Sequence, residues 1–328
     1  MLDASWLSFL TRHQAVLNLD NIEHCGNAAQ ELALVTQETA LFSVLSHYAA
    51  LHVTGKDAAS YLQGQFSCDV HQVTTSQGQL AVYCNPQGRV ICVCYVVSAP
   101  DGFLVFLPQS MLDAVLARLR KYVVFAKVAI TDVSSSYVLF ASKAPVMDDR
   151  GMGQAESFKI IVSAEKGLVL YGCHVGNAPE LWENLIKHCQ VVGCKAWDIA
   201  RMRSGLVEIT PANSEQFLPH NLNLVILGAV NFNKGCYTGQ EIIARMQFRG
   251  TVKKHLYGIT IASEQLPVVG SDIFIEGQET PVGAVVECQV TSANSYFGLA
   301  ILKDEVIGAE DIKLVLADAY ALFEVLLK

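Results

Sequence analysis

The sequence predicts an α+β fold with two related lobes, followed by a small antiparallel β region. Helix signals interrupt antiparallel-looking strands twice between residues 38 and 249. After Gly250, short β-type runs separated by turn residues are typical of a small barrel or sandwich. The length of 328 residues suits about two domains of ordinary size. We expect a helical lead-in at 1–37, lobes at about 38–133 and 134–249, and the β region at 250–328.

The first lobe is predicted to combine helices with hairpin strands. Thr54 and Asp57 have the spacing of a capping box, in which both side chains would satisfy free N–H groups at a helix start. Asn85-Pro-Gln-Gly88 carries a turn-forming residue at each end and would join two strands. The expected elements are helices over 58–62 and 111–122 and strands over 80–84, 89–97, 103–107 and 128–130.

The second lobe repeats this order, and the C-terminal region contains only β-type runs. A helix capped at Asn177 is expected to extend to Ile186, and a second helix is expected to end at Gly205. The expected strands cover 137–141, 158–162 and 168–171, then 255–261, 272–275, 282–290, 296–302 and 312–316.

The composition indicates a large apolar core rather than a membrane protein. Hydrophobic residues make up 52% of the chain and the mean hydropathy is +0.32. However, no apolar run reaches the roughly 18 residues that a membrane-spanning helix needs. Asp3 precedes any basic residue, and Arg12 and His13 interrupt the first apolar run, so no secretory signal is expected. We therefore predict a cytoplasmic protein with free thiols and no membrane partner.

Neither a metal site nor direct nucleic-acid binding is expected. Cys92-x-Cys94 is the only tight pair among ten cysteines, and its apolar neighbours indicate a buried strand without further ligands. The net charge of −8 and the pI of about 5.6 mean that the overall charge of the chain does not attract a polyanion such as RNA or DNA.

The segment 234–241, KGCYTGQE, is the strongest functional signal. Thr238 and Glu241 form a second capping box, so a helix is expected to start near Gly239. Cys236 precedes that helix, and Lys234 stands two residues away; both features favour the reactive thiolate. Gly235 and Gly239 allow the backbone to approach a ligand closely. The same residues also fit a structural loop in which Cys236 is only a small filler.

This segment resembles the signature of the YgfZ family, which comprises folate-binding, tRNA-modification and iron–sulfur-maintenance proteins related to the glycine cleavage T-protein. The resemblance continues through Ile242-Ile-Ala-Arg245 and Phe248-Arg-Gly250. It also includes Tyr61-Leu-Gln-Gly-Gln65 with Asp69, Lys121-Tyr122 with Phe125-Ala-Lys-Val128, and Ala212–Pro219 with Asn223-Leu224. It implies a two-lobed folate-binding region and a β-barrel arranged around a central opening.

The resemblance also implies a cofactor and the residues that hold it. Tetrahydrofolate or a derivative such as 5-formyltetrahydrofolate needs an aromatic wall, hydrogen-bond partners and cations for its glutamate tail. Trp197 and Tyr48 occupy the positions of folate-contacting tryptophans of the family. Arg245 and Arg249 would meet a carboxylate, and Gly235, Tyr237 and Gly239 would complete the site beside Cys236 and Lys234.

Three departures from the pattern limit the resemblance to the T-protein enzymes. One is Tyr48, which stands where a second folate-contacting tryptophan is expected, although its ring can still stack. Those enzymes carry an acidic pair in the strand that here reads Val90-Ile-Cys-Val-Cys94, and aminomethyl transfer needs that acid. Arg203 replaces a glutamate that pairs with the pterin edge in related chains, and a cation cannot accept those N–H groups. We take Glu208 as the candidate substitute.

The leading hypothesis is therefore a folate-binding accessory protein, with Cys236 as its key side chain. It would support iron–sulfur enzymes and, through them, tRNA modification. The expected partners are iron–sulfur enzymes or assembly proteins, contacted transiently. A folate-dependent aminomethyl or one-carbon transferase of the T-protein type is the alternative, and a purely structural scaffold is a third hypothesis.

Overall fold

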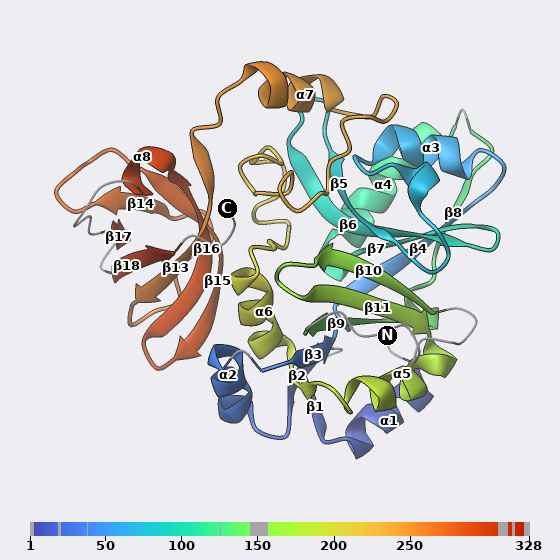
Figure 1. The fold of residues 1–328 in the computed structure, drawn as a ribbon, viewed down its shortest axis with the longest axis horizontal. Helices are drawn as coiled ribbons and strands as arrows, with labels where there is room; N and C mark the ends of the chain where they lie inside the picture. The colour runs from blue at the N-terminus through green and yellow to red at the C-terminus, as the bar shows by residue number, and fades with distance from the viewer. Residues whose placement is uncertain are drawn as a thin grey trace.

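Two five-stranded sheets and a ring of six strands surround a central helix in this computed structural model (Figure 1). The structure describes residues 3–18, 21–37, 39–124, 126–144, 157–307, 314–316 and 319–324. Helix α6 (Cys194–Arg203) and the long loop after it lie between the ring of strands and the two sheets. The mixed α+β class is confirmed. None of the described helices is both long and apolar enough to span a bilayer.

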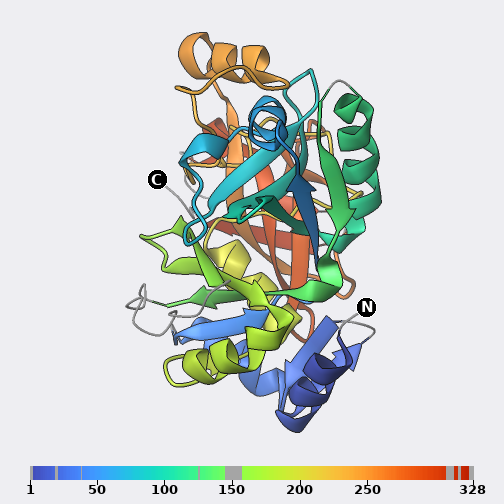
Figure 2. The same ribbon diagram turned by 90° about the vertical axis from the view of Figure 1, so that its right-hand side faces the viewer.

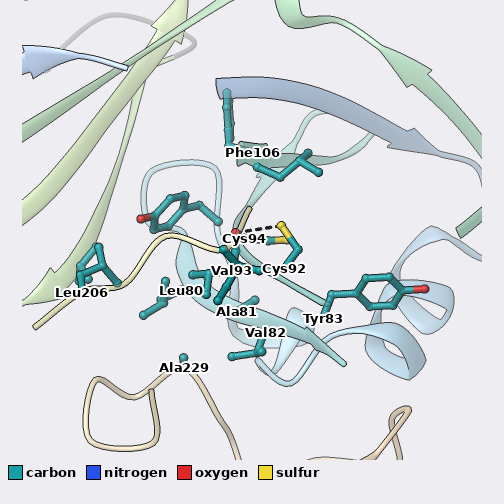
Figure 3. Packing of buried hydrophobic residues seen from close by; sticks show 14 of the residues in the cluster. Leu80, Ala81, Val82, Tyr83, Cys92, Val93, Cys94, Phe106, Leu206 and Ala229 are labelled. Carbon is teal, nitrogen blue, oxygen red and sulfur yellow. Dashed lines mark hydrogen bonds between the residues drawn. The ribbon is translucent and has the colours of Figure 1, made fainter. Parts of the chain in front are cut away.

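The first sheet is antiparallel throughout and is covered by α3 (Ala58–Gln65) and α4 (Leu112–Val123). Its strand order is β5 (Gln79–Cys84), β6 (Val90–Ala99), β7 (Gly102–Pro108), β4 (Tyr48–Thr54) and β8 (Ala129–Asp132). Eight consecutive residues of β6 are buried, which requires apolar side chains on both faces. Figure 3 shows Cys92 and Cys94 inside this packing, where the Cys92 thiol donates to the Val93 carbonyl at 3.3 Å.

The second sheet combines strands from both predicted lobes. Its order is β10 (Ser157–Ser163), β11 (Leu168–His174), β9 (Tyr137–Lys143), β3 (Leu41–Val44) and β12 (Gln190–Val191). All pairs are antiparallel except β12 with β3. Strand β3 precedes β4 in the chain but pairs with β9, so residues 45–47 cross from one sheet to the other. This crossing brings the two sheets together around those three residues.

The expected helical lead-in contains a β-hairpin. Helix α1 (Ala4–Arg12) is followed by the paired strands β1 (Ala15–Asn18) and β2 (Asn21–Cys25), and then by α2 (Ala28–Thr36). Trp6 of α1 packs edge-to-face against Trp182 of α5 (Ala178–Leu185), with ring centroids 6.3 Å apart. Burial of this aromatic pair attaches the lead-in to the helix that follows the second sheet.

Six antiparallel strands close into a barrel after Gly250. Their order is β13 (Lys254–Ala262), β16 (Ser295–Lys303), β15 (Gly283–Ser292), β14 (Asp272–Ile275), β17 (Leu314–Leu316) and β18 (Ala319–Glu324), which pairs back with β13. Residues 312 and 313 of the last expected strand lie outside the described residues. Short helices complete the chain: η1 (Val70–Gln72), η2 (Gln109–Met111), η3 (Ser134–Ser136), η5 (Val175–Asn177) and α8 (Asp304–Ile307).

The first predicted capping box is wrong. Asp57 is the N-cap of α3, but its side chain makes no capping hydrogen bond. Its Oδ2 instead accepts the Lys127 backbone N–H at 2.8 Å. The carboxylate therefore ties the start of α3 to the segment that enters β8.

Candidate functional site

A cavity of about 540 Å³ lies where residues 45–47 cross between the two sheets. The residues that line it come from α1, β2, the β3–β4 crossing with its flanking strands, β7, η2, η3, β9, α6 and the loop after α6. They are Trp6, Asn21, Val44, Leu45, Ser46, His47, Tyr48, Ala50, Phe106, Pro108, Gln109, Ser110, Ser134, Tyr137, Val138, Leu139, Cys194, Asp198 and Glu208. The lining thus includes the aromatic residues Trp6, Tyr48, Phe106 and Tyr137, together with the carboxylates of Asp198 and Glu208.

Glu208 is the centre of the polar wall. Its Oε2 accepts a hydrogen bond from the Tyr48 hydroxyl at 2.9 Å and lies 3.4 Å from His47 Nε2. Tyr48 also packs against Tyr95, with ring centroids 5.9 Å apart. These contacts hold the carboxylate and the aromatic ring in fixed relation at the cavity surface.

A buried ion cluster connects this wall to the barrel. The Arg201 guanidinium, 3% exposed, pairs with Glu287 of β15 and lies 3.5 Å from Asp198. It also donates to the Leu206 carbonyl at 2.7 Å. Glu287 Oε2 in turn accepts the Glu208 backbone N–H at 3.1 Å. A single cation therefore compensates carboxylates from α6 and from the barrel, next to the cavity.

The pKa values of the cavity groups follow from burial opposed by specific partners. Burial alone would raise the pKa of Glu208, but His47, Arg201 and the Tyr48 hydroxyl outweigh it and lower that pKa to about 2. Burial would lower the pKa of His47, but the hydrogen bond and charge of Glu208 reverse this, so the pKa is raised. Burial raises the pKa of Asp198 despite Arg201. At neutral pH Glu208 is therefore an ionised carboxylate with His47 and Arg201 as its compensating partners.

The segment Tyr61–Gln65 and the segment 234–241 meet at the loop that carries Cys236. The Lys234 ammonium donates to the backbone carbonyls of Gln63, Phe66 and Cys68 at 2.8, 2.6 and 2.7 Å. Burial lowers the pKa of Lys234 to about 8. All three acceptors lie at or just beyond the end of α3, so Lys234 anchors the loop there.

The second predicted capping box is also wrong, because a glycine begins α7 (Gln240–Arg249). Gly239 is the N-cap at φ 85°, and no side chain caps the helix. A Cβ on Gly239 would lie 2.5 Å from the Asn85 carbonyl oxygen and 2.9 Å from Gly88 Cα. Backbone-to-backbone contact with the β5–β6 turn therefore sets the start of α7, instead of Thr238 and Glu241.

Cys236 differs from the other nine cysteines in its exposure. All ten lie in the described part of the chain as free thiols, and only Cys236 is exposed. Burial raises the pKa of Cys68 to about 12 and that of Cys92 well above its ordinary value. Such thiols are inert. Tyr237, 6% exposed, lies next to Cys236 and fastens this part of the loop in the core.

The expected binding residues fall into separate places. Tyr48 lines the cavity, and so does the candidate substitute Glu208. Trp197 is buried in the core at 1% exposure and does not line the cavity. Gly235, Cys236, Tyr237 and Gly239 belong to the anchored loop, and Arg245 and Arg249 are exposed on α7. Figures 1 and 2 both place α7 at the end of the molecule opposite α1, so these arginines lie far from Trp6 and its side of the cavity.

Sequence reasoning missed His47, Asp198, Arg201 and Trp6. Arg203, expected near a pterin, instead places its guanidinium 4.5 Å from the centre of the Phe297 ring. Asp198 and Arg201 stand at i,i+3 on α6, a spacing that indicates an ion pair on a helix. No local signal indicates that α1 reaches the cavity through Trp6.

The overall architecture is that of the aminomethyltransferase T fold. The chain superimposes on the glycine cleavage system aminomethyltransferase T from Bartonella henselae with a TM-score of 0.71. This comparison covers 97% of this chain and 95% of that chain at 16% identity, and therefore shows the fold alone. The family model of the GCVT N-terminal domain matches residues 20–146.

A closer relative defines the family. The tRNA-modifying protein YgfZ of Escherichia coli O157:H7 (strain EC4115 / EHEC) is 32% identical over 250 residues. The match covers 70% of this chain and 74% of that protein. The chain belongs to the YgfZ family, which confirms the resemblance stated from its motifs.

Proposed function

We propose that this protein is a cytoplasmic folate-binding accessory protein that supports iron–sulfur enzymes and, through them, tRNA modification. The observation that carries the proposal is the cavity beside Tyr48 and Glu208. Its volume of about 540 Å³ lies within the usual range for small-molecule sites. An aromatic wall and a fixed, ionised carboxylate are what a pterin ring and its N–H edge require.

The cavity residues fit the head of a reduced folate. Tyr48, Phe106 and Tyr137 supply ring surfaces, and Glu208 accepts N–H groups where Arg203 cannot. None of the described residues that line the cavity is a lysine or an arginine. The glutamate tail would therefore extend out of the cavity toward solvent.

Cys236 is the side chain proposed to meet the partner. It is the exposed thiol of the chain, on a loop that Lys234 and Tyr237 hold in place. One thiol can contact a partner's cluster or a folate-derived one-carbon unit but cannot hold a cluster alone. The effect on tRNA would be indirect, in keeping with the net charge of −8.

The alternative, a one-carbon transferase of the T-protein type, is favoured only by the shared fold. Strand β6 supplies buried Cys92 and Cys94 where the acid pair of those enzymes is expected. An assay with aminomethylated lipoyl carrier protein and tetrahydrofolate decides between the two: turnover above the protein-free rate would establish the transferase.

Folate binding is tested by calorimetric titration with 5-formyltetrahydrofolate. Tyr48→Ala and Glu208→Gln should each weaken binding about tenfold or more, because each removes a cavity contact. Tyr122→Ala, which truncates a half-exposed tyrosine on α4, is the matched control and should bind as the wild type does. Absence of binding by the wild-type protein would overturn the folate proposal.

Fluorescence locates the ligand independently. The chain has three tryptophans, and Trp6 lines the cavity whereas Trp197 does not. A fluorescence change on addition of 5-formyltetrahydrofolate should disappear in Trp6→Phe and persist in Trp197→Phe. The reverse pattern would place the folate elsewhere.

The role of Cys236 is tested in cells that lack this protein. Cys236→Ala should fail to restore the activity of iron–sulfur enzymes, while Cys288→Ala, at a partly buried thiol, should restore it. Full restoration by Cys236→Ala would contradict the proposed role of the thiol.

A further inference from the structure

Helix α7 presents an outward side that contacts little of the rest of the protein. Ile243 is its only buried residue, while the apolar Ile242 and Phe248 are 38% and 71% exposed. Phe248 keeps one edge-to-face contact with Phe232, at 5.6 Å between ring centroids. Exposed aromatic and branched side chains on one helix are typical of a surface that a partner covers.

The same helix and the residues after it are basic, although the chain is acidic. Residues 240–254 contain four cations, Arg245, Arg249, Lys253 and Lys254, and one acid, Glu241, so their net charge is +3 against −8 for the whole chain. All four cations are exposed. Within the described residues none of the four has an ion-pair partner, and Glu241, at i,i+4 spacing from Arg245, makes no salt bridge with it. These charges are available to another molecule.

We propose that Ile242, Arg245, Phe248 and Arg249, called here the α7 face, dock an acidic protein surface that has an apolar pocket for Phe248. Aromatic and arginine side chains are enriched at the energetic centres of protein interfaces. The local positive charge on an acidic chain complements carboxylates and steers such a partner toward this side. Cys236 is exposed four residues before α7, so docking here brings the partner to the thiol.

A protein partner suits this face better than a nucleic acid. A nucleic acid carries a dense, continuous row of phosphates that a protein neutralises with many cations, whereas residues 240–254 supply four. A local acidic patch on a protein needs only the few cations of α7. The identity of this partner as an iron–sulfur enzyme rests on the proposed function. The acidic and apolar character of its surface is inferred from the α7 face alone.

The test uses the full chain and a purified iron–sulfur tRNA-thiolating enzyme as the probe. Arg245→Glu/Arg249→Glu should weaken binding at least tenfold, and added salt should weaken binding of the wild type. Phe248→Ala should weaken it about tenfold with little change in salt dependence. The control Arg120→Glu/Lys121→Glu reverses two exposed cations in the last turn of α4 and should bind as the wild type does.

Three results would overturn the docking inference. The first is wild-type binding by the charge-reversed variant. The second is binding of bulk tRNA in place of the enzyme, lost in the charge-reversed variant, which would make α7 an RNA surface. The third is a loss of 5-formyltetrahydrofolate affinity in that variant, which would assign Arg245 and Arg249 to the folate tail.

A cellular assay separates this inference from the proposed function. The cells used lack the gene for this protein. If the wild-type gene fails to restore iron–sulfur enzyme activity in them, the proposed function fails. If the wild-type and charge-reversed genes both restore it, the proposed function stands and the α7 face is not the docking surface. The inference requires restoration by the wild type and by the α4 control, and not by the charge-reversed variant.

Discussion

The cavity wall and the Cys236 loop are both polar, but they are built in opposite ways. At the cavity, side chains from distant parts of the chain satisfy one another, as Arg201 does with Glu287 and Glu208 does with Tyr48. At the loop, backbone groups do most of the holding: Lys234 donates to carbonyls, and Gly239 lies against a turn. Paired side chains therefore hold the cavity wall, whereas backbone contacts hold the loop that presents the thiol.

The difference also predicts where substitutions cost most. Removing the partner of a buried charge greatly reduces the free energy of unfolding, because no other group compensates that charge. A loop held by backbone contacts loses local order first, and the remainder of the fold keeps its own core.

Arg201→Met should have the largest effect. It leaves the Glu287 and Asp198 carboxylates, which are only 19% and 23% exposed, without their cation and should reduce the free energy of unfolding by about 3–5 kcal/mol. Urea denaturation measures the loss. Arg120→Met, at an exposed position of α4, should change the free energy by less than about 0.5 kcal/mol. A loss below about 1 kcal/mol in Arg201→Met would mean that the cluster adds little to stability.

Gly239→Ala tests the backbone contact at the start of α7. The new Cβ meets the Asn85 carbonyl oxygen, and φ 85° is strained for alanine, so we expect a loss of about 2–3 kcal/mol in the free energy of unfolding. Gly235→Ala is the matched control, because a Cβ there has no atom within 4 Å, and its effect should stay within about 0.5 kcal/mol. Equal losses in the two variants would contradict the assigned role of Gly239.

Lys234→Met tests whether the ammonium anchors the loop. Three carbonyls lose their donor, and the expected loss of stability is about 1–2 kcal/mol. Hydrogen exchange should accelerate in residues 231–239 and remain unchanged in β6. Lys187→Met, at an exposed lysine after α5, should leave both unchanged. Unchanged exchange in the loop of Lys234→Met would assign the anchoring to Tyr237 alone.

The sequence allowed the α+β class and the helices α3 to α6 to be predicted, because their periodicity is local. The motifs also indicated residues 234–241 as the candidate functional segment, and its role stays a prediction. Both capping boxes were wrong because backbone conformation decided the helix starts: Gly239 takes a left-handed φ, and Asp57 bonds elsewhere. The cavity could be predicted only in part. Tyr48 follows from the family resemblance, whereas the pairing of segments far apart in the sequence places His47 and Trp6 at the cavity, and local periodicity does not predict such pairing.

The smallest effect concerns the proton on His47. Because Glu208 raises its pKa, His47 stabilises the folded state fully below the unfolded value of about 6.5, and this contribution disappears as pH rises through the folded pKa. Glu208→Gln removes the hydrogen-bonded charge but not the burial, so the pKa of His47 should fall below its wild-type value. An NMR titration of the His47 ring measures this directly.

Stability at two pH values provides the second measurement. The free energy of unfolding at pH 5.5 minus that at pH 8.5 should be more positive for the wild type than for Glu208→Gln, because only the wild type gains from protonated His47. The exposed control Glu264→Gln should keep the wild-type difference. If Glu208→Gln also kept it, the proton on His47 would be independent of the carboxylate, and the cavity wall would lose the coupling that distinguishes it from the Cys236 loop.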